Sequence, residues 1–514
     1  MKPRKSRQQR QPRIVAVIAA MACALPLAFG PSPTAAQGLP NLGDTERQEL
    51  SPLMERKLGE QIMRDIRRDR DYLDDAPLLE YLNNFGNSLL AAHPEARGEA
   101  GYEYFFFAVR DPALNAFALP GGFIAMHSGT IIAAQNESEL ASVMSHEIGH
   151  VAQRHIARML GRQKQDSLIP LAATILAVLA ARSSPDAAQA LVLGGEGLSM
   201  QRQLSFSRDA EREADRVGLQ IMREAGFDMS GMVAFFGRLQ TASRAYNDSA
   251  PAFLRSHPLT TERIADIQAR IQEQRYKQRA DSLDFHLIRA RARVLQDDTP
   301  QGLLDTASVF ETQLQQQNRL HVAAGKYGLA MIALKQHAHA KAWTLLQEAR
   351  AAVEAAPEAS KTPTHGALLA SLAIDIRLAA DQAADALKEA EAARAQFPLS
   401  RGIARKYAEA LIEARRHDDA IRYLRDQAQL YRQEPQLQEL LAKTYAAQGK
   451  QALQHIALAE SYALSGSLPS ALDQLGIARR APDASFYDQA VIDARERELQ
   501  ARWREEMKED QKNK

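Results

Sequence analysis

The segment His146-Glu147-Ile148-Gly149-His150 has the residue types and spacing of a hydrolytic metal site. Residues four apart lie on one face of a helix, so both histidines can point at one metal ion. Imidazole suits zinc, and Glu147 is placed to act as a general base on water that the metal polarises. The pattern is typical of a metalloprotease with one Zn²⁺ per chain. The alternative is a pair of surface histidines on a helix.

A catalytic zinc ion needs a third protein ligand, and the charged segment 207–215 offers candidates. Glu211 and Asp215 are again four residues apart. One carboxylate could bind the metal while the other orients a ligating histidine. The surrounding charges fit a solvated helix face equally well, and the spacing alone leaves both interpretations open.

The motif must lie on a well-defined helix if its histidines are to share a face. Asn136 can cap the start of such a helix, and Glu139 follows three residues later, as in a capping box. Further along, His155 is five residues past His150 and is expected to leave the ligand face of the same helix. His127 falls near the end of a predicted strand just upstream.

The neighbouring elements are predicted from hydrophobic periodicity. Two helices between residues 52 and 93 should be separated near Asp74-Asp75, and a small sheet should precede the motif. The expected strands are 102–109, 115–119 and 123–126, and two amphipathic helices are expected at 203–224 and 259–281.

Beyond residue 285 the chain contains Ala-, Leu- and Gln-rich helical patterns and no strand signal. Small residues recur at Ala342, Ala386, Ala420 and Ala471. One step, from Ala386 to Ala420, equals the 34 residues of the helix-turn-helix repeat called TPR, and the others are longer. The pattern favours a degenerate TPR-like array with a concave binding groove. A generic helical array is the alternative.

The N-terminus has the layout of a bacterial secretory signal. Six lysines and arginines without an acid precede an apolar run, which is followed by Thr34-Ala35-Ala36. Cleavage after Ala36 would lower the formal net charge from +1 to −5 and remove Cys23, the only cysteine. A mildly acidic mature chain argues against nucleic acid as a partner.

These observations predict a mostly α protein in three parts. Residues 1–36 form the signal peptide, 37–285 an α+β zinc metallopeptidase domain with a small sheet, and 286–514 an all-α TPR-like solenoid. The apolar segment 168–181 is too short to cross a bilayer. A buried helix and a peripheral membrane contact both remain open for it.

Three motifs together resemble one family. HEIGH, the later helical segment Glu211-Arg212-Glu213-Ala214-Asp215 and the tripeptide Ser256-His257-Pro258 are similar to those of gluzincin peptidases. That family includes the HtpX-like heat-shock proteases, the mitochondrial Oma-type protease and the CAAX prenyl protease. The layout of signal, sheet, peptidase core and repeats is most similar to its periplasmic branch that assists β-barrel assembly.

The resemblance implies roles for individual residues. It implies that His146, His150 and Glu211 bind the zinc ion, that Glu147 is the general base and that Asp215 supports the ligands from behind. It implies that His257 lies near the metal, either as a plug in the fourth position or as an oxyanion stabiliser. It also implies that a strand within 117–126 pairs with extended substrate.

The expected function is that of a periplasmic endopeptidase in outer-membrane protein quality control. Its substrates would be unfolded or misassembled β-barrel precursors, which it would degrade or help to assemble. The β-barrel assembly machinery would be its partner through the TPR domain, and the outer membrane an associated surface. Two alternatives are a TPR chaperone or adaptor with a latent peptidase half, and a protease for general unfolded periplasmic proteins.

Overall fold

The computed structural model describes residues 50–98, 101–161, 207–245, 252–272, 279–316, 318–362 and 364–512. The predicted signal peptide (1–36) and the apolar segment 168–181 lie outside these residues. Within them, no helix is both long and apolar enough to cross a membrane.

The two helices predicted between residues 52 and 93 are confirmed as α2 (Pro52–Ile66) and α3 (Ala76–Ala92). Each begins at a side-chain cap followed by proline. Ser51 accepts a hydrogen bond from the Met54 backbone N–H at 3.3 Å, and Asp75 accepts one from Leu78 at 3.0 Å. Proline suits the first helical turn because its missing N–H would have no partner there. A short 3₁₀ helix, η2 (Pro94–Arg97), follows α3.

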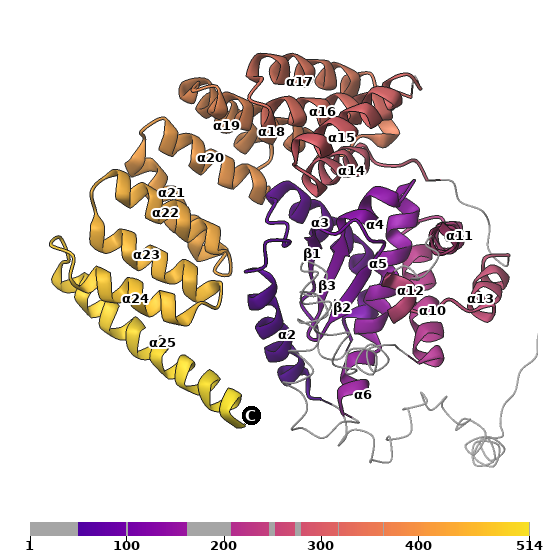
Figure 1. The fold of residues 1–514 in the computed structure, drawn as a ribbon, viewed down its shortest axis with the longest axis horizontal. Helices are drawn as coiled ribbons and strands as arrows, with labels where there is room; N and C mark the ends of the chain where they lie inside the picture. Colours follow the sequence, from indigo (N-terminus) through magenta and orange to yellow (C-terminus); the bar gives the residue numbers. More distant parts are fainter. Residues whose placement is uncertain are drawn as a thin grey trace, which may run out of the picture. The chain divides into compact units, whose positions relative to one another are not determined.

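Three strands form the predicted small sheet, in the order β1 (Phe105–Val109), β3 (Phe123–His127), β2 (Ala116–Leu119). β1 runs parallel to β3, and β2 runs antiparallel to it. Alternate residues face opposite sides. Phe106 and Ile124 join the main core, whereas Phe107 and Phe123 pack against α2. The sheet is therefore a two-sided layer with α2 on one face (Figure 1).

Helix α5 (Glu137–Ala152) holds the motif, as predicted, and it begins at the Asn136 cap, which accepts from Glu139 N–H at 2.9 Å. The predicted capping box differs from the structure in one hydrogen bond. The Glu139 carboxylate accepts from the backbone N–H of Gln135 rather than of Asn136, and it forms two 2.8 Å hydrogen bonds with Arg238. A long-range ion pair thus competes for the carboxylate that the local motif would use.

The predicted helix at 203–224 appears as α10 (Arg208–Glu224). The one predicted at 259–281 is too long: α13 ends at Gln272, and residues 279–282 are not helical because Ser282 caps the next helix. Four helices were not predicted from the sequence: α4 (Ser128–Ala133), α6 (His155–Gly161), α11 (Ser230–Ala245) and α12 (Ala252–Ser256).

From residue 283 onward the described chain is helical and contains no strand, in agreement with the predicted all-α region. Its elements are α14 (Leu283–Gln296), α15 (Pro300–Leu314), α16 (Arg319–Lys335), α17 (His339–Glu354), η4 (Glu358–Ser360), α18 (His365–Ala379), α19 (Ala383–Gln396), α20 (Arg401–Glu413), α21 (His417–Leu430), α22 (Pro435–Ala447), α23 (Gln451–Leu464), α24 (Leu468–Arg479) and α25 (Phe486–Lys512).

The recurring alanines occupy one structural position. Ala342, Ala386, Ala420 and Ala471 are each the fourth residue of their helix (α17, α19, α21 and α24), and each is fully buried. Small residues there let adjacent helices approach closely. The long step from Ala420 to Ala471 spans two additional helices, α22 and α23, which explains why the spacing departs from 34 residues.

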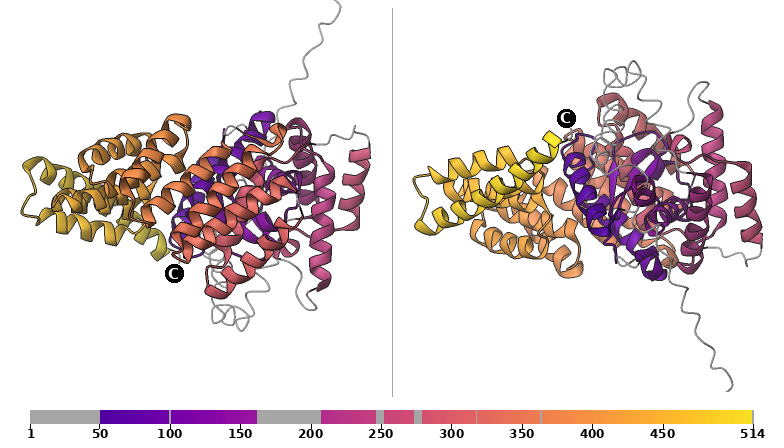
Figure 2. Two further views of the ribbon diagram at one scale, coloured as in Figure 1. Left: turned by 90° about the horizontal axis from the view of Figure 1, so that it is seen from above. Right: turned by 90° about the horizontal axis from the view of Figure 1, so that it is seen from below.

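Helix α14 contacts α3 and α4 as well as α16 and α18, so the predicted boundary at residue 285 falls within a helix shared by both regions. Figure 2 shows the salmon-coloured helices of this part of the chain beside the indigo and purple elements. Its Arg291 is buried and binds the Asp75 carboxylate through two hydrogen bonds of 2.6 and 2.7 Å. Farther along, Glu80 of α3 accepts from Ser400 Oγ and Gly402 N at the start of α20. One continuous hydrophobic core runs from Leu73 to Ile376. The division into domains remains a prediction.

Candidate metal centre

Three elements bring the predicted site residues together. Helix α5 contributes His146, Glu147 and His150, α10 contributes Glu211 and Asp215, and the residue after α12 is His257. All six side chains are buried. Burying so many polar groups costs free energy unless they form hydrogen bonds or ion pairs with one another or bind a ligand.

Glycines allow α5 and α10 to approach closely enough to form the site. A Cβ atom added at Gly149 would lie 2.8 Å from the carbonyl oxygen of Ala214 on α10. On the opposite helix, a Cβ at Gly218 would lie 3.1 Å from the backbone nitrogen of His146. The close contact sets the distance between the histidines of one helix and the carboxylates of the other.

Four potential ligand atoms converge, one each from His146, His150, Glu211 and His257, and they lie within 4.8 Å of one another. The Nε2 atoms of the two motif histidines are 3.1 Å apart. Glu211 oxygens lie 3.5 Å from His146 Nε2 and 3.4 Å from His150 Nε2. His257 Nδ1 is 3.0 Å from Glu211 Oε1 and 3.4 Å from His146 Nε2.

These separations fit a tetrahedral metal ion. Metal–ligand bonds of about 2.0–2.1 Å place the corners of a tetrahedron roughly 3.3–3.4 Å apart. Nitrogen and carboxylate lone pairs that face one another also repel unless a cation or proton lies between them. Both oxygens of Glu147, beside the cluster, have no hydrogen-bond partner of standard geometry among the described residues. The donor set therefore suits a metal ion with one carboxylate left over for chemistry.

A second ring of charge holds the ligands. Asp215 Oδ1 lies 3.0 Å from His146 Nδ1, which leaves Nε2 of that ring directed at the cluster. Arg263 donates two 2.7 Å hydrogen bonds to Asp215, and its Nη1 lies 2.8 Å from Glu211 Oε2. The same guanidinium donates to the carbonyl of Pro258, so it also fixes the residue that follows His257. Nothing in the local sequence pattern around Arg263 predicted this contact.

The pKa values follow this arrangement. Burial opposes ionisation of Glu211 and Asp215, yet neighbouring side chains outweigh it and lower both pKa values: chiefly His257 for Glu211, and Arg263 for Asp215. Burial also lowers the pKa of His146, but Asp215 and Glu211 outweigh it and raise that pKa to about 10. Burial raises the pKa of Glu147 and lowers that of His150. The cluster thus favours a positive charge among its ligands.

His257 lies between the cluster and the candidate base. Its Nε2 is 3.6 Å from Glu147 Oε1, while Nδ1 faces Glu211. The ring stacks on Phe253 of α12 with centroids 4.5 Å apart. The missed helix α12 therefore serves to carry this histidine into the site.

His155 lies off the ligand face, as expected, but the expectation that it continues the motif helix was wrong. Helix α5 ends at Ala152, Arg154 takes a left-handed conformation (φ 51°), and His155 begins α6. The turn brings His155 Nδ1 to 2.9 Å from His150 Nδ1, behind the ligand face. His127 is buried on β3 with its Nδ1 3.2 Å from Asp111 and does not join the donor cluster.

Comparison with known proteins agrees with this site. Residues 82–271 match Peptidase family M48. The chain is 30% identical to the beta-barrel assembly-enhancing protease of Escherichia coli strain K12 over 505 residues. The aligned region covers 97% of this chain and 99% of that protein. It is 39% identical over 253 residues, about half of either chain, to a putative protease of the same name from Vibrio cholerae.

A more distant relative is the mitochondrial metalloendopeptidase OMA1 of Schizosaccharomyces pombe, 31% identical over 180 residues, which cover 35% of this chain and 50% of that protein. The similarity to this relative is confined to part of the chain, whereas that to the Escherichia coli protein covers 97% of it and so includes the C-terminal helices. The chain therefore belongs to peptidase family M48, as a metalloendopeptidase of the beta-barrel assembly-enhancing group.

Proposed function

We propose that this protein is a zinc endopeptidase of the bacterial periplasm that degrades misassembled outer-membrane β-barrel proteins and assists their assembly. The observation that carries the proposal is the convergence of His146, His150 and Glu211 beside the buried carboxylate of Glu147, whose oxygens have no hydrogen-bond partner of standard geometry among the described residues. The name of the Escherichia coli relative, which aligns over nearly its whole length, supports the link to β-barrel assembly.

In this proposal each residue has a defined task. The two motif histidines and Glu211 bind zinc, which when bound supplies Lewis-acid polarisation of the scissile carbonyl and of water. Glu147 accepts the proton of the attacking water and passes it to the leaving amine. Burial raises the pKa of Glu147, which makes its carboxylate a better proton acceptor than a solvated glutamate. Asp215 orients His146, and Arg263 holds both carboxylates of α10 in place.

His257 is proposed to plug the site in the resting enzyme. Its Nδ1 is one of the four atoms that converge, so it would fill the position that water needs. The contact between its Nε2 and Glu147 would also occupy the base. Displacement of the residues after α12 would then activate the enzyme. Stabilisation of the oxyanion is the competing role.

The substrate is proposed to bind as an extended strand along β2. This strand pairs with β3 on one side only, and no other described strand lies on its outer side. It packs against α5, and Phe117 and Ala118 are only partly buried. The opposite edge of the sheet is less accessible, because the Asn83 amide bonds both N–H and C=O of Phe106 on β1. An unpaired strand edge accepts unfolded segments irrespective of their side chains.

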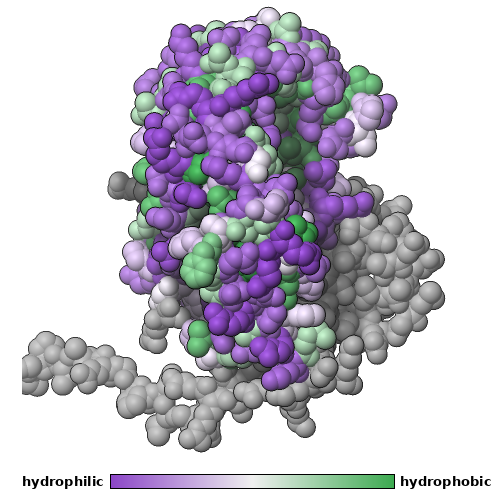
Figure 3. Space-filling model, turned by 90° about the vertical axis from the view of Figure 1, so that its left-hand side faces the viewer, coloured by the Kyte–Doolittle hydropathy of each residue, from purple (hydrophilic) through white to green (hydrophobic). Residues whose placement is uncertain are grey.

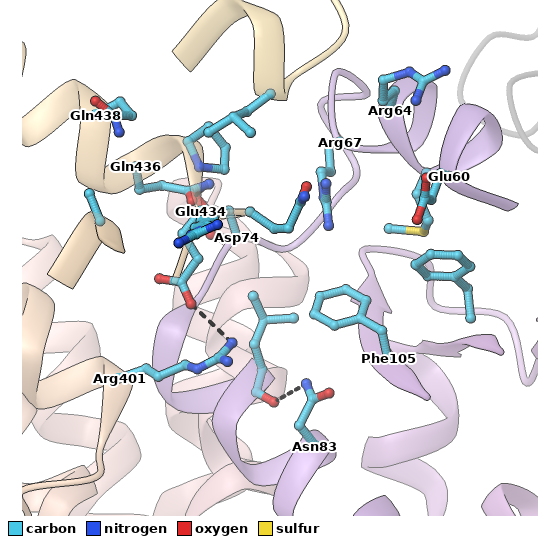
Figure 4. A pocket seen from close by; sticks show the side chains of 18 of the residues that line it. Glu60, Arg64, Arg67, Asp74, Asn83, Phe105, Arg401, Glu434, Gln436 and Gln438 are labelled. Atoms are coloured by element: carbon cyan, nitrogen blue, oxygen red, sulfur yellow. Dashed lines mark hydrogen bonds and ion pairs between the residues drawn. The ribbon is translucent and has the colours of Figure 1, made fainter. Parts of the chain in front are cut away.

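The repeats are proposed to be TPR-like and to bind the β-barrel assembly machinery or the substrate. A cavity of about 1170 Å³ lies between α2 and α3 on one side and residues of α20, α22, α23 and α25 on the other (Figure 4). Arg401 and Glu434, which pair at 3.0 Å, face the same space as Arg67 and Phe105. The face drawn in Figure 3 is mostly hydrophilic with scattered apolar groups. A polar cavity suits reversible binding of a peptide segment.

Secretion is part of the proposal. Residues 1–36 would serve as a cleaved signal peptide, followed by the peptidase domain (37–285) and the repeat domain (286–514). The basic, apolar and small-residue regions of the N-terminal segment support this division. Association with the outer membrane would follow from partners bound by the repeats.

One experiment tests the proposal directly. The full mature chain and its Glu147→Gln variant are loaded with zinc and incubated with an unfolded outer-membrane β-barrel protein and, separately, with the same protein folded in detergent. We expect the wild type to cleave only the unfolded form, and the variant to hold one zinc ion per chain and cleave neither. Equal cleavage by the pure variant would sink the mechanism. Equal cleavage of unrelated unfolded proteins would favour the general-protease alternative.

The chaperone alternative has one observation in its favour, the placement of His257 among the ligand atoms, which is consistent with a latent peptidase. Against it, the site retains the base and every candidate ligand. In cells lacking the native gene, normal barrel assembly with Glu147→Gln would favour a binding role over proteolysis.

A further inference from the structure

We infer that His155 and Glu213 form a relay that positions His150 as a metal ligand. The inference rests on the proposed metal site but assigns two residues outside it. His155 is buried, and its Nδ1 lies 2.9 Å from Nδ1 of His150. On its other side, His155 Nε2 lies 3.0 Å from the carboxylate of Glu213.

The hydrogen-bond chemistry gives the relay a single direction. A carboxylate can only accept, so Glu213 receives the N–H at Nε2 of His155. A neutral His155 then has a lone pair at Nδ1, which accepts the Nδ1–H of His150. His150 in turn is left with a lone pair at Nε2, the atom that faces His146 and Glu211. The relay therefore selects the His150 tautomer that can bind a metal ion.

The two ligand histidines of α5 are supported differently. His146 is held directly by Asp215, a buried carboxylate. His150 has an imidazole between itself and its carboxylate, and that carboxylate is near the surface, where 43% of the Glu213 side chain is exposed and Arg158 approaches to 3.1 Å. The hydrogen-bonded chain from His150 through His155 therefore ends at Glu213, near the surface. Glu213 can be substituted without removing a buried side chain from the core.

The backbone is built to bring His155 into this place. The left-handed residue Arg154 is an arginine, for which that conformation is unfavourable by about 1 kcal/mol. Its guanidinium is held by the buried Glu55 of α2 at 2.6 Å and by the carbonyl of Leu50. Tyr102 donates to the other oxygen of Glu55 at 2.8 Å. These contacts fix the turn that separates α5 from α6. A continuous helix would not place His155 beside His150.

The test measures metal affinity in the full mature chain by competition for Zn²⁺ with a chelator of known affinity. The variants are His155→Leu, which fills the space without an acceptor, His155→Asn, whose Oδ1 can accept near the Nδ1 position, and Glu213→Ala. Asp209→Ala is the matched control, an exposed carboxylate on the same helix that pairs with Arg212. The visible spectrum of the Co²⁺-loaded proteins reports ligand geometry independently of activity.

We expect zinc affinity to fall roughly 10–100-fold in His155→Leu and Glu213→Ala, the usual effect of losing the partner of a metal-bound histidine. His155→Asn should recover most of the affinity, and Asp209→Ala should match the wild type. Metal-free melting temperatures should stay close together, which separates positioning from folding.

Two results would overturn the inference. One is wild-type zinc affinity and an unchanged cobalt spectrum in both His155→Leu and Glu213→Ala. The other is an affinity in His155→Asn as low as in His155→Leu. If His155→Leu fails to fold, the exposed Glu213 still provides the test. A wild-type chain that binds no zinc would refute the proposed metal site itself, a distinct outcome.

Discussion

His257 Nδ1 lies 3.0 Å from Oε1 of Glu211, so an imidazole from the segment after α12 completes a set of four ligand atoms. In His257→Ala, the fourth position is free for water and Glu147 is released from its contact with Nε2. We therefore expect initial cleavage rates on a loosely folded protein to rise several-fold while the zinc content stays at one per chain. Loss of cleavage at full zinc content would instead assign His257 to the oxyanion.

Gly149 should be sensitive to a single methyl group. Gly149→Ala would place Cβ 2.8 Å from the Ala214 carbonyl and force α5 and α10 apart, with the ligands they carry. We expect loss of about 1–3 kcal/mol in the free energy of unfolding, as for other overpacked cores, together with weaker zinc binding. The control is Gly237→Ala on α11, where no atom lies within 4 Å of the added methyl. There alanine should stabilise the helix or leave it unchanged.

Arg263 should matter more for folding than its place outside the motifs indicates. In Arg263→Met, the buried carboxylate of Asp215 loses its main cation, and Glu211 loses its ion pair with Arg263. Breaking a buried ion pair on one side costs about 3–5 kcal/mol, measurable by urea unfolding. Arg216→Met, on the exposed side of α10, should change stability by less than about 0.5 kcal/mol. Equal stability of the two variants would contradict the described network.

The junction between α3, α14 and the repeats should respond to pH through Asp284. Burial raises the pKa of this carboxyl above its unfolded value of about 4. The folded chain then holds the proton more tightly, so this group's contribution to stability is greatest at acidic pH and is lost as pH rises through the folded pKa.

Asp284→Asn removes that titration and keeps an oxygen that can accept from Thr362 and Thr364. Between pH 4 and 7 we expect its melting temperature to fall less with rising pH than that of the wild type, and to be higher near pH 7. Parallel curves for the two proteins would show that Asp284 does not titrate in this range.

The chemistry-bearing half of the site could be predicted from local pattern because its residues repeat at helical spacing on capped helices. That holds for His146 and His150 on α5. For Glu211 and Asp215 on α10 the spacing also fitted a solvated helix face, and their roles were predicted only from the resemblance to a peptidase family. The contacts of Arg263 and His155 could not be predicted in the same way. Arg263 reaches Asp215 across 48 positions of sequence, and His155 depends on a left-handed turn at Arg154 that no turn-forming residue announces.

The fold was predicted best where periodicity is strong. The strands and the alanine positions of α17, α19, α21 and α24 follow from alternation and from repetition. Helices α11 and α12 were missed because their contacts, such as Phe253 on His257, are made with distant parts of the chain. The competing bond of Glu139 with Arg238 is another long-range effect that a local capping rule cannot include.

Helix α14 and the pair Asp75–Arg291 connect the helices around the sheet firmly to the C-terminal helices. The described residues from 50 onward belong to one compact unit, and one hydrophobic core in it extends from the helices around the sheet to α14, α16, α17 and α18. A flexible tether would let the repeats search for clients and deliver them from many directions. If the cavity beside α2 binds substrate as proposed, the shared core would hold a bound polypeptide at a fixed distance from the scissile position, so that cleavage would fall a set number of residues from the bound segment. Where a client is cut would then depend on how far that position lies from the bound segment, more than on the side chains at the cut.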